Sequence, residues 1–275
     1  MKSKIKLFLL VFTALGFLFT ACNESEDLVT SDVQTGGLVV PTANVPYKLG
    51  ATPTVDINLT IPVGPGIASV EVYNIYTDTS GVSTNEFLMK TIDIGSGNTA
   101  ADMTKPYSIT YADLINGLQL NGAPLPSDET LLPIGAYWEL SYISVMADGA
   151  RKVVNNATTT IAVANIYAGW YLCTGTFHHP TAGDRPINEE KFLVPETAYS
   201  CRIPAGDLGG SGYFVTITVD PATNDVSFSA GEPTDFFPQD GKRSFYNPLN
   251  GTFELWYYYV GANGNRVIDE VYTPL

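Results

Sequence analysis

Histidine, cysteine and positive charge are scarce in this chain of 275 residues. It has 2 histidines and 3 cysteines, and its 14 lysines and arginines stand against 28 aspartates and glutamates. This imbalance argues against binding to the phosphate backbone of nucleic acids or to anionic lipid. Long runs of helix-forming residues are also missing, whereas threonine, tyrosine, valine, isoleucine and glycine are abundant. That composition favours pleated sheet.

The usual catalytic signatures are missing as well. The sequence has no Gly-x-Ser-x-Gly, no His-Glu-x-x-His and no P-loop glycine pattern. Metal-ligand residue types gather only around His178 and His179, which are followed by Asp184, Glu189 and Glu190. Adjacent residues of a strand point to opposite faces, so these pairs favour a polar hairpin tip over a metal or catalytic site. We therefore expect no metal, no cofactor and no enzymatic activity, and favour binding.

The amino terminus has the pattern of an export signal. Lys2 and Lys4 precede an apolar run over Ile5–Phe19, which Lys6 interrupts at its second position, and Cys22 follows a small residue. The run has 15 residues, whereas a helix that crosses a bilayer needs about 20. The pattern predicts a lipoprotein signal over residues 1–21 with lipidation at Cys22, rather than a transmembrane anchor. Without the three leader lysines, 11 basic residues face 28 acidic ones, a net charge near −17.

Polarity and strand patterns divide the remainder into three parts. Residues 22–36 are polar and acidic and predict a flexible tether. Residues 37–165 predict an immunoglobulin-like β-sandwich with one short helix, because several strand patterns alternate with tight turns. Residues 166–275 predict a second antiparallel domain, either a β-sandwich or a barrel-like fold.

The first unit contains one strand of perfect alternation and one capping motif. Thr54–Val63 places apolar and polar residues at alternate positions, which predicts a strand with one buried face. Thr110 and Asp113 have the spacing of a capping box and predict a short helix, with Gly117 as its stop. The other expected strands of this unit are Ile67–Thr77, Glu86–Ile94, Tyr137–Met146 and Val153–Asn165, with a loop over Asn121–Pro133.

The second unit is predicted to consist almost entirely of strands joined by short turns. Its expected strands are Trp170–His178, Lys191–Ile203, Tyr213–Asp220, Asp225–Ala230, Ser244–Tyr246, Thr252–Val260 and Arg266–Thr273. Two cysteines, Cys173 and Cys201, fall on separate strands of this unit. They form either a disulfide, which export permits, or two buried thiols. The sequence leaves both alternatives open.

Aromatic density in the second unit supplies the candidate site. In the strand over Thr252–Val260, one row holds Phe253 and Tyr257, and the opposite row holds Glu254, Trp256 and Tyr258. An exposed aromatic ring beside a hydrogen-bonding group suits a sugar, whose C–H face stacks on the ring. Packing of Trp256 and Tyr258 beneath a loop is the alternative.

Trp170 is a further candidate of the same kind. It stands at the predicted boundary between the two units, so packing between the domains is the stronger interpretation for this residue.

The sequence resembles the two-domain, β-rich lipoproteins of Bacteroidota that are often encoded beside SusC-like transporters and SusD-like binding lipoproteins. The resemblance is carried by Leu18–Cys22, by Ile134–Leu140 with Ala147–Gly149, by Tyr167–Tyr171 leading to Gly175–Pro180, and by the closing strand pair Gly251–Val260 and Asn265–Thr273. It implies an accessory role in glycan uptake, in the manner of SusE and SusF, with SusC/SusD-like proteins as partners. It also implies a lipid anchor in the outer membrane, with the surface and the periplasmic face both open.

Three functions follow from these observations. The first is an accessory, non-catalytic binder of polysaccharide or oligosaccharide. The second is a structural or adhesive surface protein that contacts other proteins, and the third and least favoured is a glycoside hydrolase. A hydrolase needs two opposed carboxylates, and nothing in the sequence singles out such a pair.

Overall fold

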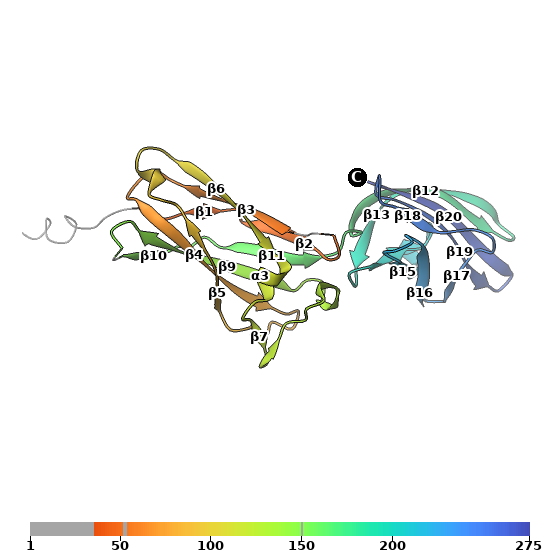
Figure 1. Ribbon diagram of the computed structural model, residues 1–275. Coiled ribbons are helices and arrows are strands. Elements are labelled where there is room, and N and C mark those ends of the chain that lie inside the picture. The colour runs from red at the N-terminus through yellow and green to blue at the C-terminus, as the bar shows by residue number, and fades with distance from the viewer. Residues whose placement is uncertain (1–35, 52–53, 150) are drawn as a thin grey trace, which may run out of the picture.

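The computed structural model describes residues 36–51, 54–149 and 151–275. The predicted signal, Cys22 and all of the predicted tether except Gly36 lie outside these residues. Strands make up 57% of the structure and helices 6%, which confirms the all-β prediction. Figure 1 shows two β bodies lying end to end. In the described part of the chain, no helix has the length and hydrophobicity needed to cross a membrane.

The first body is a sandwich of two sheets. One sheet has the order β1-β3-β6 and the other the order β2-β11-β9-β4-β5, with β10 paired to β9. The pairing is antiparallel except between β11 and β2, which run parallel. The elements are β1 (Val40–Pro41), β2 (Asn44–Lys48), β3 (Thr54–Ile61), β4 (Ile67–Thr77), β5 (Phe87–Asp93), β6 (Met103–Thr110), α3 (Tyr111–Ile115), β7 (Gln119–Leu120), β8 (Ala123–Pro124), β9 (Tyr137–Met146), β10 (Lys152–Val154) and β11 (Thr159–Ala164).

Alternation and turn chemistry predicted most of this body. Every second residue of β3 is buried, as its apolar row requires. The expected hairpin of β4 and β5 forms around Asp78, whose carboxylate accepts hydrogen bonds from the N–H groups of Ser80 and Val82. The prediction of one strand over Val153–Asn165 is wrong. The chain breaks at Asn155, whose side-chain amide donates to the carbonyl of Tyr142 and whose oxygen accepts from Val39 N–H.

The short helix α3 begins with the predicted capping box. The Thr110 hydroxyl accepts a hydrogen bond from Asp113 N–H at 3.2 Å, and the Asp113 carboxylate accepts one from Thr110 N–H at 2.8 Å. Both bonds satisfy N–H groups that have no partner within the first turn. Gly117 follows the helix with a positive φ of 71°. The prediction is confirmed at both ends.

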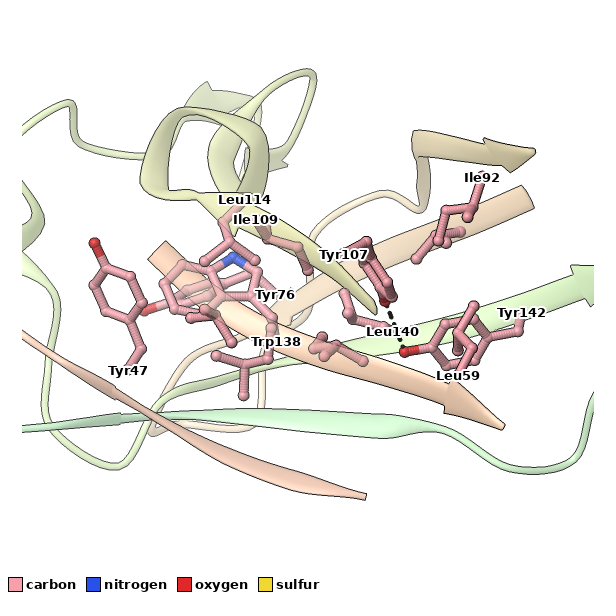
Figure 2. Packing of buried hydrophobic residues seen from close by; sticks show 14 of the residues in the cluster. Tyr47, Leu59, Tyr76, Ile92, Tyr107, Ile109, Leu114, Trp138, Leu140 and Tyr142 are labelled. Carbon is pink, nitrogen blue, oxygen red and sulfur yellow. Dashed lines mark hydrogen bonds between the residues drawn. The ribbon is translucent and has the colours of Figure 1, made fainter. Parts of the chain in front are cut away.

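Aromatic rings fill one end of the sandwich core (Figure 2). Trp138 is fully buried and lies between Tyr47 and Tyr76, with ring centroids 5.8 and 5.2 Å away. Further along the same core, the hydroxyls of Tyr107 and Tyr142 are 3.1 Å apart, as the dashed line in Figure 2 shows. The sandwich is therefore centred on aromatic packing, with the tyrosine hydroxyls paired inside it.

The second body is an antiparallel barrel. Its sheet has the order β16-β15-β14-β13-β12-β20-β19-β17, with β18 also paired to β19. The strands are β12 (Gly169–His179), β13 (Gly183–Pro195), β14 (Ser200–Pro204), β15 (Phe214–Val219), β16 (Val226–Glu232), β17 (Phe236–Pro238), β18 (Phe245–Asn247), β19 (Thr252–Gly261) and β20 (Gly264–Pro274). Short 3₁₀ turns occur at Gly97–Thr99 and Glu129–Leu131 of the sandwich and at Gly209–Ser211 of the barrel.

The sheet of the second body curls until its ends meet. The N–H of Val226 donates to the carbonyl of Ser244, and the N–H of Tyr246 donates to the carbonyl of Asn224, both at 2.9 Å. These bonds join the start of β16 to β18. Of the two predicted forms, the second domain is therefore barrel-like.

The prediction of a single strand over Lys191–Ile203 is wrong. A turn separates β13 from β14, and the Glu196 N–H donates to the carbonyl of Ser200 there.

The two bodies are joined through a buried amide. Asn165 donates to the carbonyls of Thr197 and Ser200, both at 3.0 Å, and its oxygen accepts from the N–H groups of Tyr167 and Ala168. The chain between sandwich and barrel is thereby bonded to the β13–β14 turn.

The same turn also packs against the sandwich. Ala198 belongs to the sandwich core, and Tyr199 packs against both cores. At Gly50 a Cβ atom would lie 2.9 Å from the Tyr199 hydroxyl, so the glycine allows this close approach.

Candidate functional site

Strand β19 presents the two rows that its alternation predicts. Phe253, Leu255, Tyr257 and Tyr259 are buried in the barrel core. Glu254, Trp256 and Tyr258 are half-buried on the outer face. The structure thus brings three of the sequence-predicted site residues together on one strand. We call the outer-face group of Trp256, Tyr258 and the side chains around them the Trp256 platform.

Polar groups surround Trp256. Its register partner on β20 is Asp269. The Gln239 side-chain amide donates to the Asp269 carboxylate at 2.6 Å, which fixes the orientation of that carboxylate. The Lys242 ammonium lies 5.5 Å from the centre of the Trp256 ring, within cation–π range. A carboxylate, an amide and an ammonium therefore border one indole ring.

Tyr258 extends the platform toward the edge of the sheet. Phe237 of β17 is its register partner, and the two ring centroids are 5.6 Å apart with an interplanar angle of 34°. Phe237 is 41% exposed. An open aromatic surface thus continues from the ring of Tyr258 to that of Phe237.

His178 of β12 completes the polar border. Its Nδ1 lies 2.8 Å from the Asp184 carboxylate, and its Nε2 lies 3.7 Å from that of Asp269. His179 points to the opposite face, where its Nδ1 accepts hydrogen bonds from the N–H groups of Thr181 and Ala182. The expected divergence of the two histidines at a hairpin tip is confirmed. In the described ranges no group of three metal-ligand side chains is close enough to hold an ion.

A glycine allows β12 and β20 to pack closely beside the platform. A Cβ atom on Gly175 would lie 1.9 Å from the backbone carbonyl oxygen of Asp269. Any larger residue would push apart the two strands that carry His178 and Asp269. The geometry of the polar border therefore depends on this glycine.

Trp170 lies apart from the Trp256 platform. It is 56% exposed and faces outward from the start of β12, rather than packing between the domains. Phe192 of β13 is its register partner, with ring centroids 5.3 Å apart. Phe192 and Val194 are 40% and 48% exposed, so Trp170 belongs to a mainly apolar patch. The structure does not bring Trp170 to Trp256.

The barrel interior holds a polar network that the sequence analysis missed. The Lys191 ammonium lies 2.5 Å from the Glu270 carboxylate, and both side chains are almost fully buried. Lys191 also donates to the carbonyls of Pro204 and Gly206, and the hydroxyls of Tyr257 and Tyr272 donate to Glu270. The available signal was a charged residue in the inward row of each strand, between Ile187 and Leu193 and between Ile268 and Tyr272.

Electrostatics inside the barrel favour one protonation state. Burial, with the Glu270 charge, holds the pKa values of the Tyr257 and Tyr272 hydroxyls well above their usual value. Burial, the largest single influence, would lower the pKa of Lys191, but the charge and hydrogen bond of Glu270 together with the neighbouring Cys173 and Glu189 outweigh it, and the pKa is raised. The network thus combines an ion pair with neutral phenols.

Both cysteines are free, buried thiols in the structure. The Cys173 thiol donates to Glu270 at 3.4 Å, whereas the Cys201 sulfur contacts the Asn165 side chain. Burial raises the pKa of Cys201 to about 12 and that of Cys173 further. Since the thiolate is the reactive form, neither cysteine is activated as a nucleophile.

The comparisons with known proteins concern the second body together with β11, the last strand of the first. A protein-family model for a C-terminal domain matches residues 155–273. A search of curated proteins finds no match. Residues 155–273 therefore resemble the C-terminal domain of a Bacteroides-type family, which fits a protein of Bacteroidota.

Proposed function

We propose that this protein is a non-catalytic, lipid-anchored accessory protein of glycan uptake, and that its barrel binds a sugar ring at the Trp256 platform. The observation that carries the proposal is the placement of Trp256 and Tyr258 beside Asp269 on the outer face of the barrel. An aromatic ring offers the stacking surface for sugar C–H groups, and the polar neighbours offer hydrogen bonds to hydroxyls.

The polar border supplies both kinds of hydrogen-bonding group. Carboxylates such as Asp269 and Glu254 accept from sugar hydroxyls, while the Lys242 ammonium donates to them. Gln239 holds Asp269 in place before any ligand arrives, which reduces the ordering cost of binding. The arrangement favours binding over hydrolysis because Asp184 and Asp269 both lie beside His178, whereas a hydrolase needs carboxylates opposed across a cleft.

In this proposal the sandwich separates the barrel from the membrane. Gly36 packs against Pro65, and Gly37 against Met146. The register of β4 and β9 places Met146 opposite Ile67 and Tyr137 opposite Thr77. The first described residues therefore lie at the end of the sandwich away from the barrel. A lipid on Cys22 and a tether over residues 22–36 would hold the barrel outward from an outer membrane, beside SusC/SusD-like partners.

Affinity electrophoresis of the chain from Cys22 onward tests this proposal against a panel of plant and host glycans. At least one glycan is expected to retard the protein. Trp256→Ala should weaken that retardation about tenfold or more, because the stacking surface is lost. Trp256→Phe should keep part of it. Trp170→Ala is the matched control, since it removes an exposed indole outside the platform.

Two results would contradict the proposal. One is that no glycan of the panel retards the protein. The other is a retardation that Trp256→Ala leaves unchanged. Release of reducing sugar from a retarded glycan would instead support the hydrolase hypothesis.

A second candidate function is contact with other proteins. It is favoured by the apolar patch of Trp170, Phe192 and Val194, whose exposed fractions lie between 40% and 56%. Aromatic residues of this kind are enriched at protein interfaces.

A further inference from the structure

One edge of β13 is unpaired along most of its length. On one side, β12 pairs with β13 from Gly183 to Leu193. On the other side, β14 pairs with it only at Val194 and Pro195. The part of β13 that precedes Val194 is therefore an edge strand, although it lies within the sheet order of a barrel.

The backbone groups on this edge point away from β12. The Glu196 N–H donates toward β14, to the carbonyl of Ser200. Alternate residues of a strand direct their N–H and C=O groups to the same side, so those of Asn188, Glu190 and Phe192 point the same way. Among the described residues, no hydrogen bond reaches these groups. Pro186, which has no N–H to leave unpaired, occupies the same row, as expected of an edge.

The edge is open because the loop after β14 turns into the barrel. Gly206 of this loop packs against Phe177 and Ile268, and its carbonyl accepts from the buried Lys191 ammonium. Asn188 and Glu190 are exposed. The Glu189 side chain belongs to the inward row, but 46% of it is exposed. Solvent therefore reaches both sides of the strand.

We propose that this edge receives an extended segment of another protein as an added strand. Such a segment gains main-chain hydrogen bonds from the edge and specificity from alternate side chains. Glu190 and Asp184 on the outer face, with Glu189 beside them, require lysine or arginine in the segment. The exposed ring of Phe192, supported by Trp170, requires an apolar side chain opposite it.

A second copy of this chain is a poor occupant. Edge-to-edge pairing of two β13 strands would bring Asp184, Glu189 and Glu190 of one copy against those of the other. Like charges directly opposite one another destabilise a sheet. The formal net charge of −14 adds to the repulsion. The inference does not depend on glycan binding, because Asn188, Glu190 and Phe192, whose backbone groups form the edge, are not part of the Trp256 platform. Asp184 alone lies near both, through its contact with His178.

Hydrogen exchange followed by NMR tests the proposal directly. The probe is a synthetic octapeptide of alternating lysine and valine, added to the chain from Cys22 onward. The amides of Asn188, Glu190 and Phe192 should exchange rapidly in the free protein and become protected with the peptide. The amides of Glu189 and Lys191 point toward β12 and should be protected in both states, which provides an internal control.

Fluorescence polarisation with the labelled peptide measures the strength of binding. A peptide methylated at alternate amides, or one with glutamate in place of lysine, should bind at least about tenfold more weakly. Asn188→Pro and Glu190→Lys should weaken binding similarly. The first removes an N–H that faces away from β12 and so leaves the β12–β13 pairing intact, and the second reverses a charge that attracts the lysines of the peptide. Glu139→Lys, a matched charge change on the sandwich surface, should leave binding unchanged.

Three results would overturn the proposal. The first is no saturable binding at millimolar peptide. The second is binding that amide methylation and Asn188→Pro leave intact, which indicates nonspecific attraction of charge. The third is a concentration-dependent dimer that Asn188→Pro dissolves, which would assign the edge to a second copy of the chain.

Discussion

The interiors of the sandwich and the barrel are built on different principles. In the sandwich, Trp138 is surrounded by aromatic rings, and its indole N–H has no hydrogen-bond partner in the described structure. In the barrel, Lys191 and Glu270 are equally buried, and each of their polar atoms has a partner. The sandwich interior leaves neutral polar atoms of Trp138 and Asn74 unpaired and gains from packing, whereas the barrel interior contains the charges of Lys191 and Glu270 and pairs both.

The difference shows where each domain is vulnerable. A buried ion pair is weak evidence for stability, because desolvation offsets much of its attraction. Removal of one partner, however, leaves an uncompensated charge in the core. The barrel network also joins β13 and β20 to the end of β14 at Pro204 and to Gly206 after it, so its loss would loosen these segments together. Among its described residues, the sandwich contains no ion pair that is buried to this extent.

The largest expected effect is that of Lys191→Met. Burial of the unpaired Glu270 carboxylate should lower the free energy of unfolding of the barrel by roughly 3–5 kcal/mol. Urea denaturation followed by hydrogen exchange of the β12 and β20 amides measures this change. The amides of β3 and β9 report on the sandwich and should change less.

A double variant separates loss of charge balance from loss of packing. Lys191→Met combined with Glu270→Gln removes both charges but keeps an oxygen that accepts from Tyr257 and Tyr272. It should be more stable than Lys191→Met alone. Equal stability of the two variants would show that the ion pair does not distinguish this interior from that of the sandwich.

Alkaline pH should destabilise both interiors through their buried tyrosines. The usual pKa of tyrosine is about 10, and the pKa values of Tyr257 in the barrel and Tyr107 in the sandwich lie above it, because burial disfavours the phenolate. Below pH 10 both the folded and the unfolded state hold these protons. Above it only the folded state does, so the free energy of unfolding falls as pH rises.

Substitution of single tyrosines shows how much each contributes to the fall in the free energy of unfolding above pH 10. Tyr257→Phe should reduce by one the number of protons that the barrel releases on unfolding above pH 10, and Tyr107→Phe should do the same for the sandwich. Denaturation at pH 8 to 11, compared with tyrosinate absorbance, checks both. A slope that neither substitution changes would show that other groups govern alkaline unfolding.

The smallest effect is expected at the helix cap. Thr110→Ala removes one half of the capping box and should cost about 1 kcal/mol of sandwich stability. Thr110→Ser should restore most of it, because the hydroxyl is kept. Protection of β12 and β20 amides should not change. A matching loss in the barrel would show that the two bodies unfold as one cooperative unit.

Local patterns predicted the elements, because they depend on neighbours in sequence. The alternation of Thr54–Ile61, the capping box at Thr110 and the two rows of β19 all follow from residues a few positions apart. The predictions over Val153–Asn165 and Lys191–Ile203 each join two strands into one, because strand-forming residues stand on both sides of the polar breaks at Asn155 and Glu196. Asn155 and Glu196 end those strands through long-range or turn hydrogen bonds that no local pattern contains.

The candidate site was only partly predictable for the same reason. Glu254, Trp256 and Tyr258 share one strand and were found together. Asp269 joins them through strand register. Gln239 and His178 come from other strands or loops, and sequence spacing does not reveal their proximity. Glu270 and Lys191 are 79 positions apart, and their pairing requires the curvature of the closed barrel.

Asn165 gives the molecule a mechanical property. Its amide bonds the linking chain to the β13–β14 turn, and Ala198 of that turn is embedded in the sandwich core. A pull on the barrel would therefore reach the sandwich through a stiff joint and not through a slack linker. Under a load on the barrel, the two bodies would therefore move together as one lever.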